Sequence, residues 1–410
     1  MQMMNNNIKK DNIAIIITKL TGGGAERAAS NLSMELCKKY NVYVIVFDNK
    51  NQTYTHGGIL VDLKLPLAGA KWGKTITILR RVFATRKIKN KYNITCSISL
   101  LEGPNLINVL SKTKDKTITS IRNMQSEKGM SSFRKKLLSY VSNNSDKVVA
   151  VSELVKLDMI DNFNVKKEKV VTIYNACDQE RIIKSLATGP ELQLKDKYVI
   201  NIGRLTLQKG QWHLIRAFKR VKEILPELKL AILGEGELEE QLKILAEELQ
   251  LENNVLFLGY VKDPYNIVSR SEALISSSIF EGLSNVLLET LALGKTIIST
   301  DCKAGPREIL APNSLIEQQT NVTQYAEYGI LVPPVDKLNF NSLDELTQEE
   351  IAMAEAIVAV VTNQQLRERY EKMAMIRSKD FCPDAINKNW FALLENIQKD
   401  MITCQNKLST

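Results

Sequence analysis

Short runs of β-branched residues alternate with amphipathic helical stretches along the first half of the chain. The first run, 13–17, precedes a helical stretch at about 25–38. Further runs that predict strands lie at 43–47, 95–100, 117–121, 147–151 and 170–173. This alternation is typical of a doubly wound α/β fold built on a parallel sheet.

A polar stretch at 184–197, which contains Gly189 and Pro190, interrupts the alternation and predicts a linker. The strand runs then restart at 198–202, 228–233, 255–258, 273–276, 296–299 and 329–332, with helical stretches such as 211–224 and 237–249 between them. We therefore expect two Rossmann-like domains, residues 1–185 and 196–382. A helical tail, 383–410, carries Trp390, Phe391, Leu394 and Ile397 on one side, which predicts a core-packing helix, and a return to the first domain is one arrangement it allows.

Composition places the chain among globular proteins, because 44% of its 410 residues are hydrophobic and 25% are charged. No apolar run approaches the roughly 20 residues of a membrane-spanning helix. The polar N-terminus does not resemble a signal peptide, so we expect the protein to stay in the cytoplasm. Six cysteines without a CxxC pair, and only two histidines, His56 and His213, argue against a zinc site or a disulfide framework.

The charges divide unevenly along the chain. Residues 1–190 hold 31 Lys and Arg against 15 Asp and Glu, whereas the remainder holds 24 against 31. Either the two halves face different partners, or the first half meets an anionic one, for which nucleic acid, a lipid surface and a phosphate-bearing substrate are the candidates.

A glycine-rich turn, Thr-Gly-Gly-Gly-Ala-Glu-Arg at 21–27, follows the first predicted strand and opens a helix. Gly23 and Gly24 let the backbone approach a ligand closely, and the helix N-terminus directs N–H groups at an anion. The motif is not GxGxxG, although Asp48 stands near the position of the acidic residue in dinucleotide-binding folds. The pattern alone therefore leaves an NAD-dependent oxidoreductase open.

In the second half, cations and glycines follow the first two predicted strands. Gly203 and Arg204 come directly after the strand at 198–202, and Lys209 follows five positions after Arg204. An Arg fork and a Lys point charge can converge on a diphosphate. Gly234 opens a second glycine-rich turn after the next strand.

The segment 280–289, Phe-Glu-Gly-Leu-Ser-Asn-Val-Leu-Leu-Glu, is the most informative motif. Its carboxylates, Glu281 and Glu289, frame the start of a helix that Ser284 or Asn285 can cap. Such carboxylates can bind sugar or ribose hydroxyls, while the loop N–H groups and the helix dipole attract negative charge. Asp301 and the segment Gly-Pro-Arg-Glu-Ile at 305–309 follow a later strand end on the same side of the sheet.

In this order, the segments GGGAER, GRLTLQKG, GEGEL, FEGLSNVLLETLALG and AGPREI resemble family 4 of the retaining glycosyltransferases over nearly the whole chain. The resemblance implies the GT-B fold, with two Rossmann-like domains facing a central cleft. It is closest to bacterial enzymes that build capsule, exopolysaccharide, O-antigen or N-glycan precursors on a polyprenyl diphosphate carrier. Many of these use UDP-sugars as donors of N-acetylhexosamine or hexose.

The resemblance also implies roles for individual residues. Arg204 and Lys209 correspond to the pair that neutralises the leaving diphosphate, Glu289 to the ribose ligand, and Glu281 to the contact with the donor sugar. The backbone N–H groups that meet sugar and phosphate are implied at Gly282, Leu283, Ser284 and Asn285, and the loop that covers the diphosphate at Gly23 and Gly24. Many relatives carry a histidine near the reacting face of the sugar, whereas the comparable place here holds Ile121, Arg122 and Asn123.

The absence of an evident protein nucleophile predicts front-face attack, in which the leaving diphosphate accepts the acceptor's proton. Arg204, Lys209 and helix N-termini would then stabilise the charge that grows on the diphosphate. The chain contains no D-x-D tripeptide. Because a hard divalent cation needs clustered oxygen ligands, we expect no obligatory metal and no cofactor beyond the nucleotide-sugar donor.

A basic helix is predicted at 71–91, where eight Lys and Arg occur without an acid. Trp72, Ile76, Leu79 and Phe83 fall on one helical side, with basic residues near it, among them Arg80, Arg81, Arg86 and Lys87. Such a helix lies on anionic lipid, although a core-packing helix with a solvated basic face is the competing interpretation. A second basic-apolar cluster, Ser-Phe-Arg-Lys-Lys-Leu, occupies 132–137.

Together these features favour a peripheral enzyme on the inner face of the plasma membrane, with a lipid-linked saccharide as acceptor and Arg122 on the acceptor side. No nucleic-acid motif accompanies the basic half. A GT-B-shaped epimerase of UDP-N-acetylhexosamine and a non-catalytic protein that binds nucleotide sugars remain alternatives.

Overall fold

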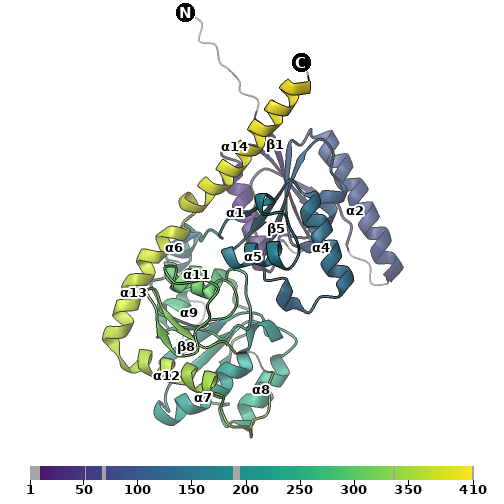
Figure 1. The fold of residues 1–410 in the computed structure, drawn as a ribbon. Helices are drawn as coiled ribbons and strands as arrows, with labels where there is room; N and C mark the ends of the chain where they lie inside the picture. Colours follow the sequence, from purple (N-terminus) through teal and green to yellow (C-terminus); the bar gives the residue numbers. More distant parts are fainter. Residues whose placement is uncertain (1–9, 51, 67–70, 188–193, 336–337, 409–410) are drawn as a thin grey trace, which may run out of the picture. The chain divides into compact units, whose positions relative to one another are not determined.

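The chain forms two compact units in a computed structural model that describes residues 10–50, 52–66, 71–187, 194–335 and 338–408 (Figure 1). The first unit comprises the described parts of 1–151, 155–176 and 387–410, and the second comprises those of 152–154 and 177–386. The division falls at Ala176, before the predicted boundary at 185, because helix α6 (Gln179–Ala187) packs against helices of the second unit.

The first unit is built on a seven-stranded parallel sheet in the order β3-β2-β1-β4-β5-β6-β7. Six strands occur where the apolar runs predict them: β1 (Asn12–Ile17), β2 (Asn41–Val46), β4 (Cys96–Leu100), β5 (Lys116–Ile121), β6 (Lys147–Ala150) and β7 (Val170–Thr172). The edge strand β3 (Ile59–Asp62) was not predicted, and none of its residues is fully buried. It lacks the apolar run that marks the central strands.

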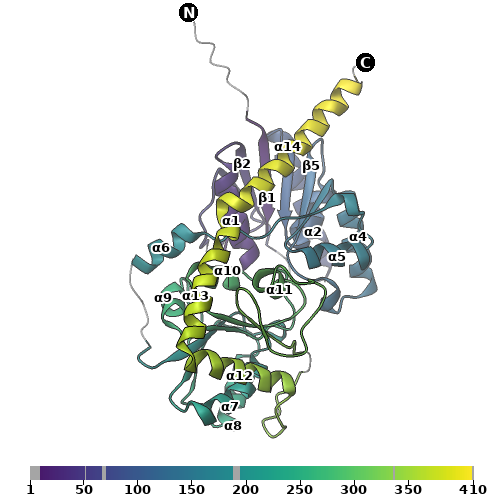
Figure 2. The same ribbon diagram turned by 60° about the vertical axis from the view of Figure 1, so that its left-hand side comes forward.

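Helices cover both faces of this sheet. Helix α1 (Gly24–Leu36) lies on one side, and α2 (Lys71–Lys91), α4 (Ser132–Asn144) and α5 (Glu153–Asp161) lie on the other (Figure 1, Figure 2). Helix α3 (Glu102–Leu110) packs between α2 and α4, and short 3-10 turns occupy η1 (Ser126–Lys128) and η2 (Lys167–Lys169). Among the described helices, none is both long enough and apolar enough to cross a bilayer.

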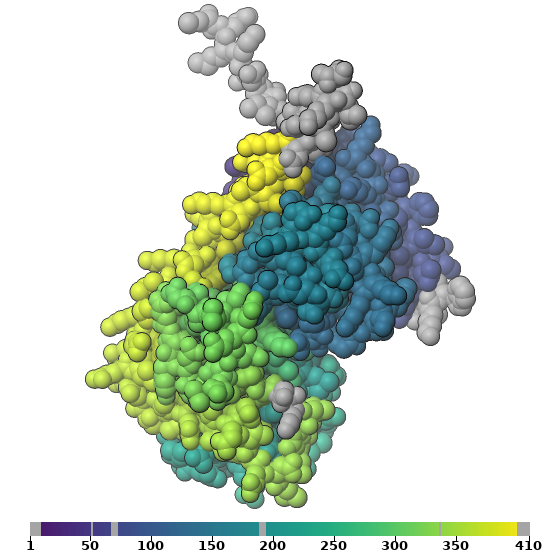
Figure 3. Space-filling model, in the orientation of Figure 1, coloured from purple at the N-terminus to yellow at the C-terminus, as the bar shows by residue number. Residues whose placement is uncertain are grey.

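The C-terminal helix α14 (Pro383–Leu408) returns to the first unit from residue 387 onward, and its outer surface is visible in Figure 3. The ring of Phe391 lies 6.3 Å from that of Tyr40, and Gln398 donates to the carboxylate of Asp11 at 2.6 Å. The apolar side predicted for this helix is buried, including Trp390, Leu394 and Ile397.

The second unit repeats the plan with the strand order β10-β9-β8-β11-β12-β14-β13. Its parallel strands are β8 (Tyr198–Ile202), β9 (Lys229–Leu233), β10 (Val255–Phe257), β11 (Leu274–Ser276), β12 (Ile297–Thr300) and β14 (Ile330–Val332). The two-residue β13 (Gln324–Tyr325), which was not predicted, pairs antiparallel at the edge. The helices are α7 (Gln211–Ile224), α8 (Glu239–Glu248), α9 (Tyr265–Arg270), α10 (Asn285–Ala292), α11 (Pro306–Leu310), α12 (Gln348–Thr362) and α13 (Gln364–Ser378), with 3-10 turns η3 (Leu207–Lys209) and η4 (Lys379–Phe381).

A buried carboxylate joins two helices of the second unit. His213 and Arg216 on α7 both contact the carboxylate of Glu350 on α12, at 2.8 and 2.9 Å. Burial works against ionisation of Glu350, but the hydrogen bonds from His213 and Arg216 outweigh it and lower the pKa of that carboxyl. His213 is therefore a core residue that ties two helices together.

Helix α2 turns a mixed side inward, on which buried polar residues alternate with Ile78, Val82 and Ile88, which pack against the apolar core. Thr77, Arg81, Thr85 and Lys89 recur every fourth residue and are buried, whereas Ile76, Leu79 and Phe83 are exposed, Phe83 to 69%.

The prediction that Arg81 faces an outside partner is wrong. Its guanidinium donates twice to the Leu65 carbonyl, at 2.9 and 2.6 Å, and lies 4.4 Å from the centre of the Phe47 ring. The side chain of Trp72 falls outside the described residues.

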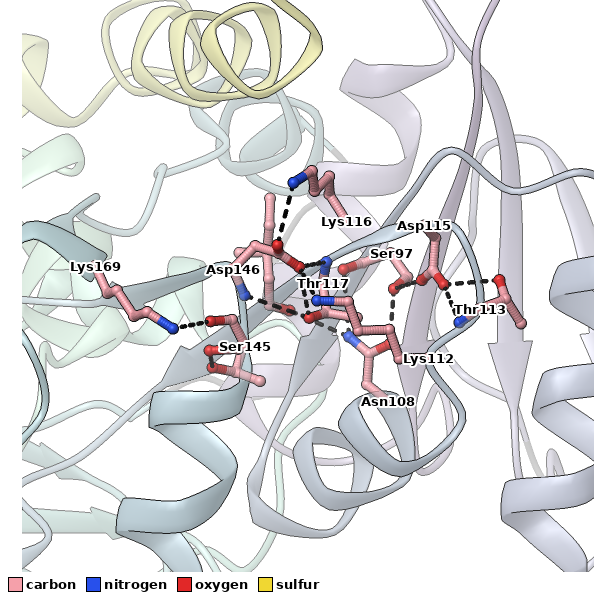
Figure 4. A network of polar contacts seen from close by, with 12 residues as sticks. Ser97, Asn108, Lys112, Thr113, Asp115, Lys116, Thr117, Ser145, Asp146 and Lys169 are labelled. Carbon is pink, nitrogen blue, oxygen red and sulfur yellow. Dashed lines mark hydrogen bonds and ion pairs between the residues drawn. The ribbon is translucent and has the colours of Figure 1, made fainter. Parts of the chain in front are cut away.

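Lys89 anchors α2 to the interior. Its ammonium lies 2.9 Å from Asp115 and donates to both oxygens of Asn108, so all three of its protons have acceptors. Ser97 bridges Asp115 and Asn108 at 2.5 and 2.7 Å, as Figure 4 shows. Burial lowers the pKa of Lys89, and the charge of Asp115 opposes that shift.

A neighbouring set of contacts extends this network to β6. Asp146, directly before that strand, accepts from Lys112 at 2.6 Å and from the backbone N–H of Thr117 at 2.8 Å (Figure 4). The two aspartates thereby tie helix α3 to the starting ends of β5 and β6.

We predict that Lys89→Met destabilises the first unit by about 3–5 kcal/mol, because it leaves Asp115 buried without its cation. Lys87→Met, which removes the same charge from an exposed position on the same helix, should change stability by less than about 0.5 kcal/mol. Urea unfolding followed by circular dichroism measures both. Equal stability of the two variants would show that the buried pair does not anchor α2.

Candidate active site

The carboxyl ends of the strands in the second unit gather most of the predicted site residues. Strand β8 lies between β9 and β11. From β8 the chain continues to one neighbour, β9, whereas from β11 it continues to β12 in the opposite direction, so the strand order reverses between β8 and β11. Open parallel sheets bind ligands at such a point. Arg204 and Lys209 follow β8, Gly234 follows β9, and Glu281 follows β11.

Lys209 and Glu281 form an ion pair at this switch point, with 2.5 Å between Nζ and Oε1. Their side chains are 20% and 8% exposed, so the pair is largely removed from water. Ser278 donates to the same carboxylate oxygen at 2.7 Å, and Gln208 donates to the neighbouring carbonyl of Phe280 at 3.0 Å. Cation and carboxylate are therefore held side by side in one geometry.

This close packing leaves little room at Gly203 and requires glycine at position 234. A Cβ on Gly203 would lie 3.2 Å from the Lys209 side chain, which runs alongside it. Gly234 has a φ of 137°, and a Cβ there would lie 1.9 Å from the Gly203 carbonyl oxygen. The predicted glycines thus permit the lysine and the turn after β9 to approach the turn after β8.

Backbone hydrogen bonds lock the loops to one another. Glu281 N–H donates to the Lys303 carbonyl at 3.1 Å, and Ile279 N–H donates to the Gln208 carbonyl at 2.9 Å. Leu205 N–H donates to the Glu235 carbonyl at 3.0 Å. Loops that follow β8, β9, β11 and β12 therefore form one preorganised edge.

Arg204 is exposed on this edge. Within the described part of the chain its guanidinium forms no ion pair, in contrast to the paired Lys209. An anion at this edge would meet a guanidinium open to solvent and an ammonium held by Glu281.

Helix α10 begins directly after the loop that carries Glu281, Gly282 and Leu283. Ser284 occupies the N-cap position, but its side chain accepts no capping hydrogen bond, so the cap predicted for Ser284 is not formed, and Asn285 is the first helical residue. Glu289 lies one turn inside the helix and is half-buried. Gly282, Leu283, Ser284, Asn285 and Glu289 thus stand together at one helix start.

Asp301 and Arg307, from the motif at 301–309, form a buried ion pair. The backbone N–H of Thr320 also donates to the Asp301 carboxylate, at 2.6 Å. They shape the loop that follows β12. Within the described residues, no three or more His, Cys, Asp or Glu side chains are arranged to hold a metal ion.

Ser278 and Gln208 were missed in the sequence. Ser278 stands three residues before Glu281, and Gln208 stands one residue before Lys209, so nearness to the predicted pair was the available signal. Ser278 contacts a residue three positions away, whereas Gln208 contacts a residue 72 positions away, and only the second contact lies beyond local pattern.

The remaining predicted residues belong to the first unit. Gly23 is the N-cap of α1, and Gly24 is its first residue, at the carboxyl end of β1. Arg122 follows β5 and donates to the amide oxygen of Asn175. Burial lowers the pKa of Arg122 to about 10, and the charge of Glu26 opposes that shift.

Comparisons with known proteins match both units. A family model described as Glycosyltransferase Family 4 matches residues 22–181, and one described as Glycosyl transferases group 1 matches residues 184–332. An uncharacterized glycosyltransferase of Methanocaldococcus jannaschii is 35% identical over 340 residues, 78% of this chain and 83% of that protein.

A relative from Campylobacter jejuni carries the name N-acetylgalactosamine-N,N'-diacetylbacillosaminyl-diphospho-undecaprenol 4-alpha-N-acetylgalactosaminyltransferase. It is 30% identical over 392 residues, 90% of this chain and 95% of that protein. The crystal structure of Anabaena HepE with UDP and glucose is similar with a TM-score of 0.72 at 17% identity, covering 94% of this chain and 100% of that one. The predicted GT-B fold is confirmed.

Proposed function

Since the chain belongs to the family 4 glycosyltransferases, we propose that it moves a sugar from a UDP-sugar to a polyprenyl-diphosphate-linked saccharide, with retention of configuration. The sugar is an N-acetylhexosamine or a hexose, and the product serves cell-surface polysaccharide or glycan synthesis. The observation that carries this proposal is the meeting of Lys209 and Glu281 at the switch point of the second sheet. The undecaprenol diphosphate in the name of the Campylobacter relative supports the acceptor class.

The donor's own connectivity fits this pair. A nucleotide sugar joins its sugar directly to a diphosphate, and Glu281 and Lys209 place a hydroxyl acceptor and a phosphate ligand side by side. Glu281 receives hydroxyls of the donor sugar, Lys209 and Arg204 receive the diphosphate, and Glu289 receives the ribose. Backbone N–H groups at the start of α10 add positive potential for the phosphates.

In the proposed reaction, an acceptor hydroxyl attacks the anomeric carbon on the face from which the diphosphate leaves. The bond between the anomeric carbon and the phosphate oxygen breaks, the new glycosidic bond forms, and the hydroxyl proton passes to the departing phosphate. The protein contributes by stabilising negative charge that grows on the leaving group, which is worth most where water is excluded.

Lys209→Ala and Arg204→Ala should each lower kcat by about two orders of magnitude, since each removes a charge-assisted contact to the leaving diphosphate. Release of UDP, measured together with lengthening of the lipid-linked glycan, reads out the reaction. Lys219→Ala, at an exposed position on α7, is the matched control and should retain full activity. A double variant of Arg204 and Lys209 that folds and turns over normally would overturn the diphosphate assignment.

We also predict that transfer persists in excess EDTA, because the cations of Arg204 and Lys209 supply the charge that a divalent ion supplies elsewhere. Initial rates with EDTA, Mg²⁺ and Mn²⁺ make the comparison. Complete loss of transfer on chelation, restored by either ion, would contradict metal independence.

We propose further that the enzyme works peripherally on an anionic membrane, at the inner face of the plasma membrane, through helix α2. Ile76, Leu79 and Phe83 are exposed, and Arg80, Arg86 and Lys87 are exposed on the same helix. An outward side that combines apolar and basic residues suits the boundary between lipid headgroups and acyl chains.

The wild type should therefore co-sediment with vesicles that contain anionic phosphatidylglycerol at low salt and dissociate at high salt. Changing Arg80, Arg86 and Lys87 to Gln removes about 1 kcal/mol for each charge, so partitioning should fall by on the order of a hundredfold. Changing exposed Lys219, Lys372 and Lys379 of the second unit to Gln is the control with equal charge loss. If the wild type ignores anionic vesicles at low salt, α2 is not a membrane contact.

A further inference from the structure

The strand order of the first sheet also reverses, between β1 and β4. Strand β1 pairs with β2 on one side and β4 on the other, and the loops after β1 and β4 lead into α1 and α3. The crevice between such diverging loops is the place where parallel sheets bind ligands. The loop after β4 was not singled out in the sequence.

Leu101, the residue that joins β4 to α3, has a strained backbone. Its φ of 78° and ψ of 155° lie in a region that side chains other than glycine rarely adopt. A hydrogen bond of 2.9 Å from Asn105 N–H to the Leu101 carbonyl holds this conformation. Strain of this kind persists where the surroundings impose it, and it commonly marks ligand sites.

The next residue, Glu102, joins two cations from other elements. One carboxylate oxygen lies 3.0 Å from Lys128 on η1, and the other lies 2.8 Å from Arg134 on α4. Burial works against ionisation of Glu102, but the hydrogen bonds and charges of Arg134 and Lys128 outweigh it and lower the pKa of the carboxyl. The cluster therefore keeps one net positive charge and leaves donors on both cations.

An exposed aromatic residue adjoins these cations. Phe133, directly before Arg134 in the first turn of α4, is 74% exposed. Lys135 and Lys136 follow and are also exposed. A ligand with an anionic head and an apolar body would satisfy both features, whereas a free nucleotide or a neutral glycan would satisfy at most one.

Gly103 leaves room beside the cluster. A Cβ on this residue would have no heavy atom within 4 Å, and its φ lies outside the left-handed range. Folding therefore does not require glycine here, in contrast to Gly234. Open space next to Glu102 is consistent with a ligand that approaches the start of α3.

We infer that Lys128 and Arg134 bind the diphosphate of the polyprenyl-linked acceptor, with Phe133 against the first isoprene units and Glu102 as the carboxylate that pairs with both cations until the diphosphate replaces it. This subsite rests on the proposed function, because it deepens the assignment of the acceptor. A diphosphate could also come from the donor, so the test must separate the two sources.

Farnesyl diphosphate, below its micelle concentration, serves as the acceptor probe, UDP as the donor probe and farnesol as the probe without phosphate. Lys128→Gln and Arg134→Gln should each weaken farnesyl diphosphate binding by about tenfold or more and leave the Kd of UDP unchanged, as measured by calorimetry. Lys135→Gln, which removes the same charge from the neighbouring helical position, should change neither. Farnesol should bind weakly to every variant.

Two further variants sharpen the assignment. Glu102→Gln should tighten farnesyl diphosphate binding by up to about fivefold, because it removes the competing carboxylate. Gly103→Ala should preserve or raise the Tm while weakening the same binding, since it fills the space beside the cluster. Weaker farnesyl diphosphate binding by Glu102→Gln would show that the carboxylate does not compete with the diphosphate for Lys128 and Arg134, and would overturn the inference.

Transfer kinetics separate failure of this inference from failure of the proposed function. If the wild type transfers sugar and the Lys128, Arg134 double variant raises the acceptor KM with little change in donor KM, the subsite is supported. If the wild type transfers sugar and the double variant keeps both the acceptor KM and farnesyl diphosphate affinity, the subsite is wrong and the function stands. Loss of UDP affinity in the double variant would assign the cations to the donor.

Discussion

The ion pair between Lys209 and Glu281 depends on the order of the strands in the second sheet. Because β8 and β11 are neighbours whose following loops diverge, the two side chains meet from segments 72 residues apart. A lysine and a glutamate so removed from water each need a partner, and separately they would be costly to bury. Together they hold a cation and a carboxylate in one fixed geometry, which is the kind of preorganisation that the proposed reaction requires.

The first unit uses its buried polar groups to orient a helix. Lys89 and Arg81 hold one side of α2 inward, where Asp115, Asn108 and the Leu65 carbonyl accept their hydrogen bonds. The consequence is that Phe83 and Leu79 face outward. Apolar residues of α2 therefore lie on two sides, because Ile78, Val82 and Ile88 pack against the core while Leu79 and Phe83 remain exposed.

The sequence predicted the central strands well because their apolar, β-branched runs are buried on both faces and leave a clear pattern. It missed β3 and β13, because one is a partly exposed edge strand and the other has two residues. It placed Arg204, Lys209 and Glu281 at strand ends, and the fold brings those ends to one sheet edge. Contacts such as Ser278 with Glu281, or Lys128 and Arg134 with Glu102, depend on side-chain geometry that spacing does not encode. Arg81 was misplaced for a related reason, since helical periodicity separates two sides of a helix without saying which one is covered.

The stereochemistry of the transferred sugar tests the central claim most directly. The purified protein would be incubated with an α-linked UDP-N-acetylhexosamine or UDP-hexose and a lipid-linked acceptor, and the anomeric coupling constant of the product would be measured by proton NMR. The account predicts an α-glycosidic linkage formed in step with UDP release. A β-linked product would contradict front-face transfer, and an interconverted UDP-sugar without a lengthened glycan would contradict glycosyl transfer itself.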